Sequence, residues 1–288
     1  MTHLKTRTGQ FPIGFRRGGW SWQSDISTAI DWAKSHGFGV LDLSRNADEI
    51  ASVTKAGLRV GSVDLLEWQG LISADASKRA ESIDRNNRYI AECGAQNYFA
   101  VMIPADQSLP RKENLEYMID SLNKIAPELE AAGGRLGIEG WPGAGSLVCT
   151  PETFRATFAA CPSPSIGINY DPSHLLRMGI DPIRFLNEFV SRVGHVHGKD
   201  TEILTADLYE YGYELPAAYK QDPPFGSTAW RYTIPGHGET HWQEVFRILK
   251  ANNYAGAVSI ELEDKNYNGS SEGEQKGLIE GAQFLATC

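Results

Sequence analysis

Short apolar segments rich in β-forming residues alternate with amphipathic helical segments along the chain, and this alternation constrains the fold more than any other feature. Alternating strands and helices predict a parallel sheet with right-handed crossovers. Eight such units within 288 residues predict a single (β/α)8 TIM barrel domain over residues 1–288. We expect the barrel strands at 12–15, 40–43, 59–66, 98–103, 136–139, 166–170, 193–197 and 257–261.

A doubly wound open sheet is the alternative arrangement for alternating strands and helices. That fold predicts a glycine-rich phosphate-binding turn after the first strand, and Gly18-Gly19 does not match the dinucleotide fingerprint. The chain also contains no P-loop motif and no internal repeat. These observations favour the barrel.

Capping residues mark the starts of several expected helices. Thr150 followed by Pro151 is typical of a helix N-terminus, because proline is well tolerated in the first turn. Thr240 and Gln243 have the spacing of a capping box. We therefore expect helices to begin at both places.

Charge and composition narrow the function classes. The formal net charge of −9 argues against nucleic acid or an anionic membrane as the main partner, because both require clustered Lys and Arg. No apolar run reaches the length of a membrane span. Residues 1–10 lack the apolar stretch of a secretion signal, so we expect a cytoplasmic location. The four cysteines show no CxxC pairing and predict reduced thiols.

Four polar residues stand at the carboxyl ends of the last four predicted strands: Glu139, Asp171, His197 and Glu261. Barrel enzymes carry their chemistry at this end, and neighbouring strands allow the four side chains to converge. Three carboxylates and one imidazole predict a divalent-metal site, with Mn²⁺ the first choice and Mg²⁺ or Co²⁺ the alternatives. A single strand-end aspartate is more often a helix cap, so the prediction rests on the four residues together.

Other residues near these strand ends are candidate substrate-binding groups. His174 lies just past the sixth strand, within reach of substrate or metal, or else caps the following turn. Lys199 would stabilise a developing oxyanion. Asp200 would orient the imidazole of His197 or contact the metal, unless it forms an ordinary ion pair with Lys199. Trp141 comes two residues after the fifth strand and would wall the pocket.

The connection 201–238 is the one long irregular segment, and it is rich in tyrosine, tryptophan and proline. Long connections in compact domains are usually functional, and the loop after the seventh barrel strand lies on the catalytic face. One prediction is a lid whose aromatic rings stack on a sugar. The other is a small packed subdomain that covers the rim, and the two are compatible.

At these residues the chain resembles the xylose isomerase-like barrel superfamily, in particular the sugar phosphate isomerase/epimerase group. The matching segments are 137–139, 169–174, 195–200 and 258–261, together with Trp230-Arg231-Tyr232. The resemblance implies a metal held by Glu139, Asp171, His197 and Glu261. It also implies that the two glutamates move protons on opposite faces of a ketose, through an enediolate that the metal stabilises, and that the residue matching His174 contacts a substrate oxygen.

The segment after the metal histidine departs from the ketose epimerases, which carry an arginine there. This chain has Lys199-Asp200-Thr201-Glu202 instead, and Arg231 in the insertion is the candidate to supply the missing contact. The Lys-Asp pair and the Trp-Arg-Tyr segment are closer to the inositol- and keto-sugar-processing members. Those members include metal-dependent lyases that eliminate the aglycone of 3-keto-glycosides.

The sequence therefore predicts a divalent-metal-dependent isomerase or epimerase that acts on a ketose or keto-sugar. The lyase is the alternative enzyme, and a non-catalytic sugar-binding or assembly subunit is the alternative from another class. We expect a small carbohydrate as the ligand, a homo-oligomer or a partner subunit as the assembly, and no nucleic-acid or membrane partner. The lack of a phosphate cradle favours an unphosphorylated sugar.

Overall fold

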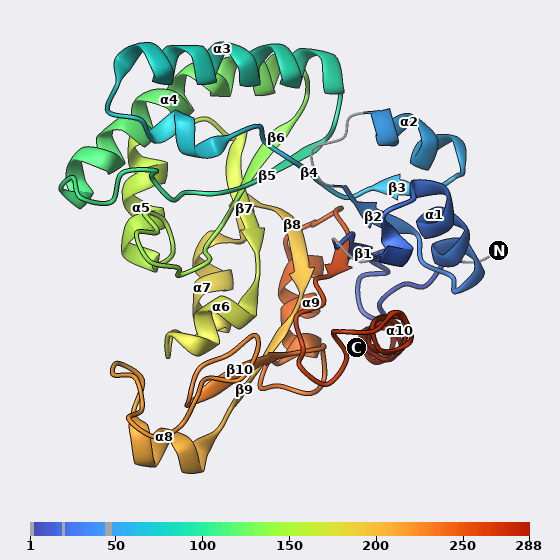
Figure 1. Ribbon diagram of the computed structural model, residues 1–288. Coiled ribbons are helices and arrows are strands. Elements are labelled where there is room, and N and C mark those ends of the chain that lie inside the picture. The colour runs from blue at the N-terminus through green and yellow to red at the C-terminus, as the bar shows by residue number, and fades with distance from the viewer. Residues whose placement is uncertain (1–2, 19–20, 44–47) are drawn as a thin grey trace.

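The computed structural model describes residues 3–18, 21–43 and 48–288. Within these residues nine short strands form one parallel sheet in the order β3-β2-β1-β11-β8-β7-β6-β5-β4, with helices outside it (Figure 1). The first strand pairs with the last, as a barrel requires. The strands are β1 (Ile13–Arg16), β2 (Val40–Asp42), β3 (Arg59–Val60), β4 (Val63–Asp64), β5 (Asn97–Val101), β6 (Arg135–Glu139), β7 (Ile166–Tyr170), β8 (Val193–Gly198) and β11 (Val258–Ile260).

Two short strands replace the predicted third strand. β3 pairs with β2, while β4 pairs with β5, so the segment 59–64 acts as one bent barrel strand. The bend lies at Gly61, where an added Cβ would stand 2.0 Å from Oδ1 of Asp42. With β3 and β4 counted as one strand, the ring has eight members. The predicted (β/α)8 TIM barrel is confirmed.

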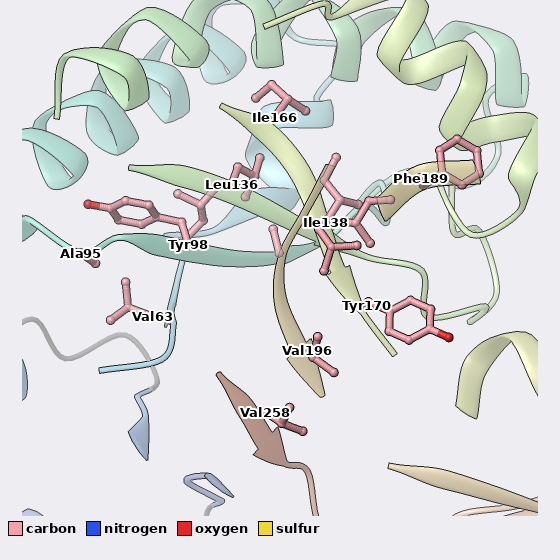
Figure 2. Close-up of a cluster of buried hydrophobic side chains, with 14 of the residues drawn as sticks. Val63, Ala95, Tyr98, Leu136, Ile138, Ile166, Tyr170, Phe189, Val196 and Val258 are labelled. Atoms are coloured by element: carbon pink, nitrogen blue, oxygen red, sulfur yellow. The ribbon is translucent and has the colours of Figure 1, made fainter. Parts of the chain in front are cut away.

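The strands and helices share a continuous apolar core. Figure 2 shows part of it, including Tyr98, Leu136, Ile138 and Val196, all of which are fully buried. Burial of one aliphatic side chain of this size stabilises the fold by about 1.5–3 kcal/mol. Parallel strands covered on both faces are nearly continuous apolar runs, which is why these segments are recognisable in the sequence.

The helices largely follow the expected positions. Thr150 caps α5 through its hydroxyl, with Pro151 in the first turn, as predicted. The capping box at Thr240 is wrong: α9 begins one residue later, His241 occupies the N-cap position, and the Thr240 hydroxyl has no hydrogen-bond partner among the described residues. The helices are α1 (Ile26–Ser35), α2 (Asp48–Lys55), α3 (Ala76–Cys93), α4 (Arg111–Ala131), α5 (Pro151–Ala160), α6 (Pro172–Arg177), α7 (Pro182–Phe189), α9 (Trp242–Ala251) and α10 (Ser271–Thr287).

The long connection after β8 has secondary structure of its own. β9 (Asp200–Ile203) and β10 (Trp230–Thr233) form an antiparallel pair, and α8 (Thr205–Tyr211) lies between them in the chain. We call residues 200–233 the arm. In Figure 1 the arm lies beyond the carboxyl end of β8, on the side where the site is expected. The Thr201 hydroxyl donates to the Ser173 carbonyl at 2.9 Å, so the arm is fastened to α6.

Two further expectations concern the cysteines and membrane spans. Cys93, Cys149, Cys161 and Cys288 are all free thiols. In the part of the chain that the structure describes, no helix combines the length and the apolar composition needed to cross a bilayer.

Candidate metal centre and catalytic site

Four neighbouring strands deliver the predicted site residues to one edge of the barrel. Glu139 is the last residue of β6, Asp171 follows β7, His197 lies near the end of β8, and Glu261 follows β11. Atoms of Glu139, Asp171, Glu261 and His174 all lie within 4.8 Å of one another. Three of the four predicted ligands are therefore close together in space with His174 among them, and His197 adjoins this group through Glu139 and Glu261.

Glu139 is buried and held by three side chains. Asn169 donates to its Oε2 at 2.7 Å, and His174 Nε2 lies 3.2 Å from its Oε1. His197 Nδ1 lies 2.6 Å from Oε2. Burial and the charge of Glu261 oppose ionisation, but His197 and the hydrogen bond from His174 outweigh them and hold the pKa of Glu139 below its usual range. Glu139 is therefore ionised at neutral pH.

Asp171 has one structural oxygen and one oxygen that faces the site. Its Oδ1 accepts hydrogen bonds from the Ser173 backbone N–H at 2.9 Å and the Ser173 hydroxyl at 2.6 Å, which caps α6. Its Oδ2 lies 3.2 Å from Nζ of Lys199 and 3.4 Å from Nε2 of His174. Because the cap fixes the carboxylate plane, Oδ2 is pre-positioned toward the other ligands.

Glu261 lies between two cations. Lys199 Nζ is 2.5 Å from its Oε2, and Arg16 Nε is 3.3 Å from its Oε1. Burial disfavours the charged form, yet the charges of Lys199, His197 and Arg16 hold the pKa of Glu261 well below its usual range. Glu261 is therefore a carboxylate at neutral pH, with each oxygen close to a positive charge.

Lys199 is fully buried at the carboxyl end of β8. Its ammonium contacts the carboxylates of Asp171, Glu261 and Glu263, the last at 3.1 Å from Oε2. The same ammonium lies 4.7 Å from the centre of the Tyr232 ring. Burial alone would lower the pKa of Lys199, but the three carboxylates raise it well above its usual value. The side chain is therefore a cation at neutral pH inside the predicted metal cluster.

His197 rests on a polar network in the barrel interior. Its Nε2 lies 3.5 Å from Oδ2 of Asp42. The same Asp42 oxygen lies 2.8 Å from Nε2 of His195, and the Ser259 hydroxyl donates to Asp42 Oδ1 at 2.7 Å. Phe99 stacks on the His197 ring with centroids 5.5 Å apart. Asp42, His195 and His197 also group as possible metal ligands, and the 2.8 Å contact between Asp42 and His195 is also the length of a direct hydrogen bond.

Three of the predicted substrate-binding residues lie outside this cluster. Arg231 pairs with Glu202 at 2.6 Å and with Asp264 at 3.1 Å, which holds the arm in place.

Asp200 accepts hydrogen bonds from the backbone N–H groups of 201, 236 and 240 and from the Trp242 indole, so it organises the return of the chain from the arm to α9. Trp141 is 37% exposed in the loop after β6.

The sequence reasoning missed Arg16, the last residue of β1. Its Nη2 donates to Asp64 at 2.9 Å, and its guanidinium lies 4.3 Å from the centre of the Phe99 ring. Its Nη1 is buried with no hydrogen-bond partner among the described residues, so one donor is left over. The same rule that selected Glu139 and Glu261, a polar residue at a strand's carboxyl end, selects Arg16 when it is applied to the first strand.

A cavity of about 190 Å³ adjoins Glu261. Its charged lining is supplied by Arg16, Arg17, Glu261 and Glu263, while Leu278 and Phe225 are among the residues that supply apolar surface. Phe225 comes from the arm and has a left-handed φ of 56°, a strained conformation for a bulky residue. Such strain is typical of residues that the surrounding structure places for function.

The donor set fits a divalent ion. Three carboxylates within a few ångströms repel one another, and a divalent cation relieves that cost. Asp171 Oδ2 is buried beside Lys199 and His174, and His197 Nδ1 is buried beside Glu139 and Glu261, so both atoms face the cluster. Oxygen ligands with one imidazole suit Mn²⁺, Mg²⁺ or Co²⁺, and Zn²⁺ accepts the same donors. Two imidazoles compete for the nitrogen position, His197 through Nδ1 and His174 through Nε2.

A family model described as xylose isomerase-like TIM barrel matches residues 30–288. YfiH, an uncharacterized protein of Bacillus subtilis, is 39% identical over 145 residues, which are 49% of this chain and 44% of YfiH. Inosose dehydratase of Clostridium beijerinckii is 28% identical over 152 residues, or 53% of this chain and 48% of the dehydratase. The chain spans about half the length of the curated relatives it matches.

Solved structures share the fold at low sequence identity. The 3-keto-D-glucoside 4-epimerase YcjR of E. coli has a TM-score of 0.66 and 18% identity, with 96% of this chain and 100% of that chain covered. The D-psicose 3-epimerase of Clostridium cellulolyticum H10, solved with D-tagatose, has a TM-score of 0.69 and 14% identity at the same coverage. The IolI protein with a bound zinc atom has a TM-score of 0.66 and 17% identity, with 95% of each chain covered.

Proposed function

Because this chain belongs to the xylose isomerase-like TIM barrel family, we propose that it is a divalent-metal-dependent isomerase or epimerase of ketoses or keto-sugars. The observation that carries the proposal is the pairing of Glu139 and Glu261. They end different strands, their carboxylate oxygens lie in one cluster, and both are held in the ionised form. An ionised, positioned carboxylate is the base that a carbon acid next to a carbonyl requires.

The remaining residues of the cluster have complementary roles in this proposal. A divalent ion held by Glu139, Asp171, Glu261 and His197 would supply the positive charge that stabilises the negative oxygens of an enediolate. Lys199 and Arg16 add fixed positive charge on the Glu261 side, and His174 lies on the Glu139 side. One glutamate would take the proton from the carbon beside the carbonyl, and the other would return a proton to the product.

Elimination from a keto-sugar or keto-inositol is the second candidate. It begins with the same proton abstraction and then expels water or an aglycone, which requires a proton donor beside the leaving group. Two N–H groups, on Lys199 and His174, lie within 3.4 Å of Asp171 Oδ2 and are suited to this task. The inosose dehydratases among the relatives favour this outcome.

A deuterium-exchange experiment tests both candidates. The protein, loaded with Mn²⁺, would be incubated in D₂O with ketoses, inososes and 3-keto-glucosides, and deuterium at carbon would be followed by mass spectrometry together with loss of water or aglycone. We expect deuterium incorporation or elimination with one class of substrate. We expect that reaction to be lost in both Glu139→Gln and Glu261→Gln. Glu116→Gln, which changes an exposed residue of α4, is the matched control.

The outcomes separate the alternatives. Stereochemical change without elimination identifies an epimerase, and loss of water or aglycone identifies a lyase. Binding of a sugar without any exchange, unchanged in Glu139→Gln, supports a non-catalytic sugar-binding or assembly subunit. Exchange that persists at full rate in both glutamate variants overturns the proposed base roles.

A further inference from the structure

His174 is connected to the arm by a chain of short contacts that the proposed chemistry does not yet use. Its Nδ1 lies 2.7 Å from the hydroxyl of Tyr232 on β10, and that hydroxyl accepts a hydrogen bond from Arg177 Nη1 at 2.6 Å. On the other side of the ring, Nε2 faces Glu139 Oε1 at 3.2 Å. The chain of contacts thus runs from Arg177 through Tyr232 and His174 to Glu139.

The chemistry of the two ends fixes the direction of this chain. An arginine can only donate, and an ionised carboxylate can only accept. Tyr232 therefore receives a hydrogen bond from Arg177. Its own proton has one acceptor among the described residues, Nδ1 of His174. The Tyr232 side chain is almost fully buried, with 4% exposure, so the opposite arrangement would leave the hydroxyl proton without an acceptor, which is costly in a buried site.

We propose that Arg177 and Tyr232 are positioning residues that hold His174 in the neutral tautomer with its proton on Nε2. A protonated Nε2 donates a hydrogen bond and has no lone pair for a metal. His174 then presents an N–H to Glu139, to Asp171 and to a substrate oxygen between them, and the ligand imidazole is His197. This inference deepens the proposed function and rests on it only for the identity of the group that receives the N–H.

The fold ties the two positioning residues to His174 through several contacts. His174 and Arg177 lie on the same short helix, α6. Arg177 Nη2 donates to the Pro142 carbonyl at 3.0 Å, and its guanidinium lies 4.5 Å from the Trp230 ring. Tyr232 is paired with Thr201 across β9 and β10, next to the hydrogen bond that fastens the arm to α6. The arm therefore sets the position of the Tyr232 hydroxyl relative to the His174 ring.

The tautomer is measured directly by long-range ¹H–¹⁵N correlation NMR of the full-length protein at neutral pH. The His174 signals are identified by their loss in His174→Gln. We expect Nδ1 to resonate as an unprotonated nitrogen and Nε2 as a protonated one, and the Nε2 proton to persist when Zn²⁺ is added. In Tyr232→Phe, we expect the two nitrogen shifts to move toward each other, because Nδ1 has lost its donor.

Matched variants separate this role from a general effect on folding. Tyr219→Phe removes a hydroxyl from a fully exposed tyrosine of the same arm and should leave the His174 shifts unchanged. Arg177→Lys keeps a donor and should retain the tautomer, whereas Arg177→Met should shift it; this pair also serves if Tyr232→Phe does not fold.

Several results would overturn the inference. They are a proton on Nδ1 in the wild type, an imidazolium, loss of the Nε2 proton on Zn²⁺ addition, or His174 shifts unchanged in both Tyr232→Phe and Arg177→Met. The readout needs no substrate. A correct tautomer without deuterium exchange on any sugar would therefore contradict the proposed function and leave this inference standing.

Discussion

Lys199, which is fully buried, forms an ion pair with the partly exposed Glu261 in the predicted metal cluster, with Nζ 2.5 Å from Oε2. The same ammonium lies 3.2 Å from Oδ2 of Asp171. Two of the four predicted ligands therefore share a cation that belongs to the protein itself. The cluster combines a fixed positive charge with the capacity to bind a divalent ion, and the two cations stabilise the same carboxylates.

Removal of this fixed charge should weaken the metal-free protein. In Lys199→Met, the buried Asp171 and the partly exposed Glu261 lose their shared partner. We expect the free energy of unfolding without metal to fall by about 3 kcal/mol and the stabilisation by Mn²⁺ to increase. Urea denaturation with and without Mn²⁺ measures both. Lys220→Met, which breaks a partly exposed ion pair on the arm, should change stability by less than about 1 kcal/mol. Equal effects of the two variants would contradict this account.

Metal affinity should depend on the charge of Asp171 and not on its role as a helix cap. Asp171→Asn keeps an oxygen that can accept from the Ser173 N–H and loses the negative charge at Oδ2. We expect Mn²⁺ affinity, measured by isothermal titration calorimetry, to fall by about tenfold or more, while thermal stability without metal falls less than in Lys199→Met because the lysine keeps Glu261 and Glu263. Elemental analysis of the purified wild type should show a bound divalent metal, and metal-free protein that does not take up Mn²⁺ would remove the basis of the site.

Stability of the metal-free protein should decline in acid because of the depressed pKa of Glu261. A carboxyl whose pKa is lower in the folded state stabilises the fold above its unfolded pKa, about 4.3. That contribution is lost as pH falls from this value toward the folded pKa. Chemical denaturation at a series of pH values should show a smaller acid loss in Glu261→Gln than in Glu116→Gln. Identical pH profiles for the two variants would refute the shift.

Stability of the metal-free protein should also decline at alkaline pH, because the pKa of Lys199 is raised in the folded state. A base whose pKa is higher in the folded state gives its full stabilisation below its unfolded pKa, about 10.4, and loses it as pH rises toward the folded pKa. We expect the metal-free wild type to lose stability above this pH more steeply than Lys199→Met, in the same denaturation series. A steeper alkaline loss in the variant would contradict the ion-pair assignment.

Arg16 should be important for substrate binding. It bridges Asp64 and Glu261 and lines the cavity beside them. Arg16→Lys keeps the charge but cannot reproduce the forked geometry of a guanidinium. For the substrate found by deuterium exchange, we expect kcat/KM to fall by about tenfold in Arg16→Lys, a loss of about 1.4 kcal/mol of transition-state stabilisation, and further in Arg16→Met. Arg59→Lys, on the β3 strand at the other end of the barrel, is the control and should retain activity.

The barrel and the core of the site were predictable because they depend on local patterns. Parallel strands buried on both faces are apolar runs, and their carboxyl ends must share one edge. Glu139, Asp171 and Glu261 therefore converge as expected. The break at Gly61 was not predictable, because it depends on the position of Asp42 on the neighbouring strand.

The arm was less predictable because its structure depends on distant partners. Arg231 was expected in the site, but it pairs with Glu202 across the β9–β10 ribbon and with Asp264 after β11. Asp200 was expected beside His197, but four donors surround it: one in the arm, two in the connection that follows the arm, and the Trp242 indole of α9. The sequence shows neither set of contacts, since both depend on how a long insertion folds back onto the barrel.

The hydrogen bond between Thr201 and Ser173 has a consequence for engineering. It joins the arm to the helix that carries His174, while Phe225 of the same arm lines the cavity. We therefore expect the arm and α6 to be exchangeable between related barrels only as one unit. An arm grafted from a related barrel should transfer its substrate preference only when its own α6 segment is transplanted with it, and an arm deleted on its own should leave a stable barrel with a disordered catalytic mouth.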